Sequence, residues 1–91
     1  MNSIIWKVSF SDEADKSLIK LDKPIRERIR KFARELQTLQ NPRLRGEALT
    51  ANLANLWKYR VGDYRLICRI NDKELLILIV KIGHRSNVYK R

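Results

Sequence analysis

The stretch LWKYRVGDYRLICRINDKELLILIVKI, residues 56–82, decides the fold. Its first two apolar runs alternate with polar or basic residues at every second position, which predicts two β-strands over 57–61 and 64–70. Gly62-Asp63 lies between them and predicts a tight hairpin turn. After a second turn at 71–73, residues 75–82 are apolar on both faces, which predicts a central strand.

The segment before this stretch predicts one strand and two helices. Residues 4–10 alternate with period two, and Ser11 is a suitable N-cap for a short helix marked by Ala14, Leu18 and Leu21. A second helix is expected from Pro24 to Leu39, with one apolar face and a basic face from Arg26 to Arg34. Residues 43–55 are expected to form a loop, with a helical turn around 48–54.

These elements follow each other in the order β-α-α-β-β-β. The predicted fold class is therefore α+β, with an N-terminal helical hairpin packed on a mostly antiparallel four-stranded sheet. A chain of 91 residues is expected to form a single domain, residues 1–91. The Trp6, Trp57 and Cys68 side chains are expected in the core.

Charge is the unusual quantity. Twenty Lys and Arg against ten Asp and Glu give a net charge of +10. Residues 42–91 alone contribute eleven basic and four acidic side chains, or +7. Nucleic acid, an anionic membrane or an acidic protein would balance such a charge. No apolar run approaches the length of a membrane span, and no signal peptide is evident, so we expect a cytoplasmic protein without a membrane partner. With one Cys and one His, we expect no disulfide, no metal and no cofactor.

The basic residues of the β half suggest a phosphate site. Alternation places Lys58 and Arg60 on one face, and the two-residue turn brings Arg65 of the next strand near them. The last strand then leads to His84, Arg85 and Tyr89, which can converge on the same face; these six are the candidate catalytic residues. Cleavage of RNA needs cations that neutralise charge on the phosphate and a group that moves protons near neutral pH.

Each of these residues also has a purely structural interpretation. Lys58 and Arg60 fit the solvated side of an amphipathic strand, and Arg65 fits a pair with a carboxylate. Tyr89 fits a C-terminal anchor on the core as well as a base-stacking residue. His84 fits a merely exposed residue after a strand.

The runs LWKYRVGDYRLICRI and KIGHRSNVYKR, with NPRLRG at 41–46, resemble the RelE/ParE toxin superfamily, and in particular its RelE-like mRNA interferase branch. The resemblance covers essentially the whole chain. It implies a toxin of a type II toxin-antitoxin system that inhibits translation. Such a toxin is a ribosome-dependent endoribonuclease that cleaves mRNA in the A site by 2′-hydroxyl attack, without metal. It also implies a cognate antitoxin and an operator DNA bound through the toxin-antitoxin complex.

Residue by residue, the resemblance implies that Lys58 and Arg60 are the basic pair before the turn and that Arg65 binds the scissile phosphate. It implies that Arg85 stabilises the transition state or is part of the acid system, that His84 is the acid, and that Tyr89 stacks on a base or helps to activate the nucleophile. The second basic position is a lysine in the prototype and an arginine here; arginine is a poor general base. The segment between Arg85 and Tyr89 is also shorter than the prototype's.

Two other functions remain open at this point. One is a ParE-like gyrase-inhibiting toxin of the same fold, which acts by binding a protein. The other is a non-catalytic RNA-binding or ribosome-binding module, whose affinity would fall steeply with salt.

Overall fold

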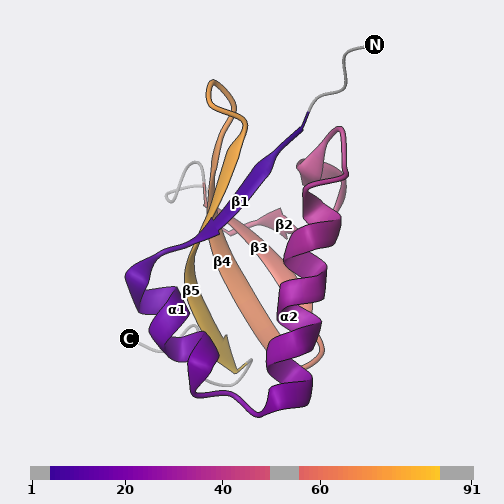
Figure 1. Cartoon of the computed structure of the whole chain (residues 1–91). Coiled ribbons are helices and arrows are strands. Elements are labelled where there is room, and N and C mark those ends of the chain that lie inside the picture. Colours follow the sequence, from indigo (N-terminus) through magenta and orange to yellow (C-terminus); the bar gives the residue numbers. More distant parts are fainter. Residues whose placement is uncertain (1–4, 50–55, 85–91) are drawn as a thin grey trace.

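The computed structural model describes residues 5–49 and 56–84. In chain order the elements are β1 (Lys7–Phe10), α1 (Asp12–Ile19), α2 (Lys23–Leu36), the 3-10 turn η1 (Pro42–Leu44), β2 (Glu47–Ala48), β3 (Leu56–Val61), β4 (Tyr64–Asn71) and β5 (Leu76–His84). The five strands form one sheet in the order β1-β5-β4-β3-β2. Both helices cover one face of this sheet (Figure 1). Neither described helix is long and apolar enough to cross a membrane.

The α+β class and the mostly antiparallel sheet are confirmed, because three of the four described ladders are antiparallel and only β1 runs parallel to β5. The expected number of strands, four, was wrong, because the sheet has five. Part of the expected loop over 43–55 forms β2, which pairs with Trp57 and Lys58. Two residues are too few to show a period-two pattern. Ala48 lies in this strand, so a helical turn does not begin there, and residues 50–55 lie outside the described part of the chain.

The helix boundaries follow local chemistry. The Ser11 hydroxyl accepts a hydrogen bond from the Ala14 N–H at 3.1 Å, which caps α1 as expected. The second helix ends at Leu36, one turn before the predicted Leu39. There the backbone changes to i→i−3 hydrogen bonds, and the Thr38 hydroxyl donates to the Glu35 carbonyl at 2.7 Å. This side-chain bond competes with continuation of the helix.

The core lies between the helices and one face of the sheet. Tyr59 is opposite Leu66 in the β3–β4 ladder, and both are almost fully buried. The Phe32 ring of α2 packs edge-on against Tyr59 at 5.3 Å between centroids. Trp6 and Cys68 are buried as expected, and burial raises the pKa of the Cys68 thiol above its ordinary range. Trp57 is only half-buried.

A bulge keeps the core face apolar along β5. Ile67 is opposite Lys81 and Cys68 is opposite Ile79, so Val80 is the extra residue. Because of it, Ile82 and Ile79 both pack in the core although they are three residues apart. The other face of the sheet, which we call the outer face, therefore carries the odd-numbered residues of β4, beginning with Arg65.

The Tyr59 hydroxyl donates a hydrogen bond to the Pro42 carbonyl at 2.9 Å, in a buried position. Burial also raises the pKa of Tyr59, so the hydroxyl stays a donor. We expect Tyr59→Phe to lower the free energy of unfolding by about 1–2 kcal/mol, because the Pro42 carbonyl loses its buried donor. Urea unfolding measures this. The control Tyr64→Phe, at a half-buried ring on the same hairpin, should cost less than about 0.5 kcal/mol. Equal losses would contradict this role.

Candidate active site

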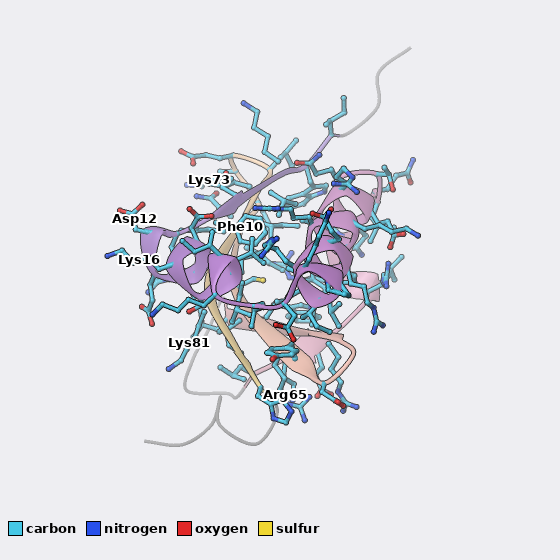
Figure 2. The ribbon with its side chains drawn as sticks, turned by 60° about the horizontal axis from the view of Figure 1, so that its bottom comes forward. Phe10, Asp12, Lys16, Arg65, Lys73 and Lys81 are labelled. Carbon is cyan, nitrogen blue, oxygen red and sulfur yellow. The ribbon has the colours of Figure 1, made fainter. Side chains whose placement is uncertain are left out.

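Three basic side chains lie together on the outer face of the sheet. Lys58 and Arg60 are two residues apart in β3, and Arg60 is directly opposite Arg65 in the β3–β4 ladder. We call them the basic triplet. Figure 2 shows Arg65 at the end of the sheet. Arg65 and Lys81 both lie on the side of the sheet away from α1. The structure therefore brings these three predicted residues together.

The turn at Gly62-Asp63 sets this register. Gly62 has a φ of +61°, whereas Asp63 is not among the residues with positive φ. This combination is typical of a type II′ turn, which closes a two-residue hairpin. Directly opposite residues have Cβ atoms roughly 4.5–5.5 Å apart, and like charges there are destabilising. The fold thus holds Arg60 and Arg65 where an anion between them would stabilise both.

Glu47 is a carboxylate beside the basic triplet. It is opposite Lys58 in the β2–β3 ladder, and its Oε2 lies 2.7 Å from the Lys58 Nζ. The Lys58 side chain is only 14% exposed and that of Glu47 is 57% exposed. The hydrogen bond from Lys58 lowers the pKa of Glu47, and the charges of Arg60 and Arg65 lower it further. Glu47 therefore stays ionised and forms an ion pair with Lys58.

Several contacts hold the segment before β2 against the sheet. The Arg43 guanidinium binds both carboxylate oxygens of Asp72, at 2.7 and 3.0 Å. The Trp57 indole N–H donates to the Arg45 carbonyl at 2.7 Å. Gly46 has a φ of +76°, and a Cβ there would lie 2.3 Å from the Lys58 carbonyl oxygen. A glycine is needed at this close approach, which leads the chain into Glu47.

A hollow of about 300 Å³ opens at the edge of β3, where β2 begins. It is lined by Phe32, Arg45, Gly46, Glu47, Lys58, Tyr59 and Arg60. Three cations and one carboxylate line it, so its net charge is positive. This edge hollow adjoins the basic triplet through Lys58 and Arg60, and it is large enough for a phosphate and part of a nucleotide.

The structure does not bring the His84 side chain onto this face. His84 is opposite Tyr64 in the β4–β5 ladder and two residues beyond Ile82, which packs in the core. Its ring contacts Tyr64 edge-on at 5.5 Å between centroids. The alternation of β5 therefore places His84 on the helix side of the sheet. Arg85 and Tyr89 lie outside the described residues.

Glu47 is the residue of the site that the sequence analysis missed. No pattern marks it, because the contact with Lys58 depends on the ladder of a two-residue strand. Among the described residues, no group of three or more His, Cys, Asp and Glu side chains is arranged to hold a metal ion.

A family profile described as "ParE toxin of type II toxin-antitoxin system, parDE" matches residues 8–89, from the second residue of β1 onwards. The chain belongs to this toxin family. A curated relative, Toxin RelG of Mycobacterium tuberculosis (strain ATCC 25618 / H37Rv), is 33% identical over 87 residues, which cover 94% of this chain and 98% of RelG. The toxin is thus of the RelE type within the RelE/ParE superfamily.

Solved structures agree with this assignment. The toxin-antitoxin complex RelBE2 of M. tuberculosis contains a chain that is 30% identical with a TM-score of 0.80, and the match covers 94% of this toxin and 98% of that chain. The archaeal RelE-RelB complex of Pyrococcus horikoshii OT3 matches at 27% identity and a TM-score of 0.72, covering 92% and 99%. The isolated E. coli RelE toxin matches at 26% and 0.72, covering 92% and 90%.

The two ion pairs of β2 and η1 predict an acid dependence of stability. Lys58 lowers the pKa of Glu47 and Arg43 lowers that of Asp72. A carboxyl group whose pKa falls on folding stabilises the protein above its ordinary pKa, and this stability is lost as the pH falls through the folded-state pKa. We expect the melting temperature of the wild type to fall more on acidification from neutral pH than that of E47Q/D72N.

The matched control is Glu74→Gln, which removes an exposed carboxylate that forms no ion pair within the described residues. Its melting curve should follow the wild type across the acid range. Parallel pH profiles for the wild type and the double variant would show that the two ion pairs contribute nothing to folding.

Proposed function

We propose that this toxin is an endoribonuclease that cleaves mRNA in the ribosomal A site and so stops translation in the cytoplasm. The observation that carries the proposal is the basic triplet, three cations held at neighbouring ladder positions on one face of the sheet. The similarity to RelG and to RelE toxins supports it. A site of this kind suits a single phosphodiester group, which needs several donors at once.

In the proposed reaction the ribose 2′-oxygen attacks the adjacent phosphorus, and the bond to the 5′-oxygen of the next nucleotide breaks. The products are a 2′,3′-cyclic phosphate and a 5′-hydroxyl. Negative charge grows on the non-bridging oxygens in the transition state. Arg60 and Arg65 are permanently charged and fixed by the hairpin, so they stabilise this charge without reorganisation.

A proton must leave the 2′-hydroxyl. Lys58 forms an ion pair with Glu47 at 2.7 Å, and we place it in this scheme as a cation beside the phosphate. Glu47 itself is ionised and lines the edge hollow with Lys58 and Arg60. We assign to Glu47 the role of proton acceptor and to Lys58 the positioning of that carboxylate. No metal takes part in this reaction scheme.

The leaving 5′-oxygen must take up a proton to become the 5′-hydroxyl of the product. His84 lies at the end of β5 on the other face, so its assignment as the acid stays a prediction. Arg85 keeps the role that the family resemblance implies, as transition-state stabiliser or part of the acid system. Tyr89 likewise keeps its implied role of stacking on a base or helping to activate the nucleophile.

We also propose a cognate antitoxin as the partner of this toxin. The RelBE2 and RelE-RelB structures are toxin-antitoxin complexes, and their toxins share this fold. A net charge of +10 favours an antitoxin with acidic segments. Operator DNA would be bound by the complex of the two proteins.

The description of the matching profile favours a second candidate, because it names ParE toxins. A ParE-like toxin would inhibit gyrase by protein binding and would not need the basic triplet to surround a phosphate. The edge hollow and the fixed Arg60–Arg65 pair favour the nuclease.

Arg65→Ala should abolish growth inhibition, because the loss of one such donor typically lowers the rate about 10²–10³-fold. The matched control is Arg69→Ala, an exposed arginine four residues along the same strand and face. Colony counts after induction, with toxin levels measured on immunoblots, report the effect. Full toxicity of Arg65→Ala, or equal attenuation by Arg69→Ala, would refute the phosphate-binding role.

His84→Gln tests the acid assignment. If His84 protonates the leaving oxygen, single-turnover cleavage should slow and the limb of the pH–rate profile that depends on the protonated acid should disappear. Tyr64→Phe serves as the control because it keeps the ring that contacts His84. An unchanged pH–rate profile for His84→Gln would show that His84 is not the acid and has only a structural role at the end of the sheet.

A further inference from the structure

A second hollow, of about 280 Å³, lies between α2 and the β3–β4 turn. It is lined by Arg28, Lys31, Phe32, Glu35, Arg45, Arg60, Val61 and Gly62. We call it the helix groove. It shares Phe32, Arg45 and Arg60 with the edge hollow, so the two hollows adjoin each other along the side of the sheet.

The helix groove is strongly cationic. Four basic residues line it against a single acidic residue, Glu35. That carboxylate lies 3.7 Å from the Arg45 guanidinium, so it neutralises only part of the charge. Within the described part of the chain, neither Arg28 nor Lys31 forms a salt bridge. A groove of this charge attracts a polyanion.

Backbone geometry places these cations at the rim. Arg28, Lys31 and Glu35 are three and four residues apart in α2, so they lie along one face of the helix. A Cβ on Gly62 would lie 3.1 Å from the Arg28 Nη1, which means that the missing side chain lets this guanidinium lie against the hairpin turn. Arg28 therefore connects the helix to the turn that sets the basic triplet.

The lining of the groove suits phosphates rather than bases. Phe32 is the aromatic residue there, but it is only 6% exposed. The Arg45 guanidinium lies over its ring at 4.7 Å from the centroid. No ring face is therefore open for a base to stack on, whereas three of the four cations are arginines, which bind phosphate oxygens well.

We infer that the helix groove is a second phosphate-binding site, which holds the RNA backbone next to the scissile nucleotide as the strand continues out of the edge hollow. This inference rests on the proposed nuclease function. It adds a track along α2, by which we mean a row of cations that binds the phosphates of the flanking nucleotides. An RNA strand fits better than an acidic peptide because its phosphates recur at every nucleotide and Arg60 borders both hollows. Contacts to phosphates carry no sequence information, so the groove binds every sequence equally.

The test compares R28A/K31A with K23A/R30A. Both variants remove two positive charges from α2, but Lys23 and Arg30 do not line the groove and project from the opposite side of the helix. The probe is a 2′-O-methylated single-stranded RNA oligonucleotide, which cannot undergo 2′-hydroxyl attack. Fluorescence anisotropy at several salt concentrations gives the slope of log K against log salt. Circular dichroism confirms that both variants are folded.

Each lost phosphate contact to a single strand lowers the slope by about 0.7, so R28A/K31A should lower it by about 1.4 and K23A/R30A should leave it unchanged. The loss should be the same for oligonucleotides of different sequence. Equal slopes for R28A/K31A and the wild type, or an equal loss in K23A/R30A, would overturn the inference. A third outcome would also overturn it. If R28A/K31A lost affinity for an oligoglutamate peptide but kept the wild-type salt slope for RNA, the groove would bind acidic protein and not RNA.

Arg65→Ala in the same titration separates the two proposals. If Arg65→Ala weakens RNA binding and R28A/K31A does not, the nuclease proposal stands and the track along α2 is wrong. If neither variant affects RNA binding, both proposals fail.

Discussion

The register of the β3–β4 hairpin is the constraint on which the rest of the structure depends. The two-residue turn at Gly62-Asp63 fixes Arg60 opposite Arg65 on the outer face and Tyr59 opposite Leu66 in the core. A slip by one residue would exchange the two faces, because side chains alternate along a strand. It would bury arginine under the helices and expose the ring that binds Pro42 and packs on Phe32. The same strand register therefore both buries the core residues and assembles the basic triplet.

Stability and the site compete at this hairpin. Like charges at directly opposite positions cost free energy, and the fold offsets only part of this repulsion with Glu47, which lies beside Lys58. The segment from Pro42 to Gly46 is tied down by Tyr59, Trp57 and Asp72, and it carries Glu47 to its place. The remaining positive charge is what a bound phosphodiester would neutralise. The same logic extends along α2, where the helix groove continues the cationic surface beyond the triplet.

The sequence predicts the elements that have a period and misses those that do not. The strands around Gly62-Asp63 alternate cleanly, so their register and the grouping of Lys58, Arg60 and Arg65 follow directly. A two-residue strand has no period, which is why β2 and the contact of Glu47 were missed. The side of His84 was not predictable for another reason. Residues 75–82 are apolar on both faces, and a bulge at Val80 shifts the alternation, so the sequence alone does not show to which face the end of β5 belongs. The toxin family could be recognised from the sequence because its basic positions lie in the regular strands.

The central claim, that the basic triplet grips a ribose-linked phosphodiester as it breaks, is tested most directly by mapping cleavage with the purified toxin. One mRNA is incubated with the toxin either free or on programmed ribosomes with an empty A site, and primer extension locates the cuts. The account predicts a cut at the A-site codon of the ribosome-bound mRNA, with a 5′-hydroxyl on the downstream fragment and no cut in the free mRNA. Intact mRNA in both reactions, with inhibition of gyrase instead, would contradict it.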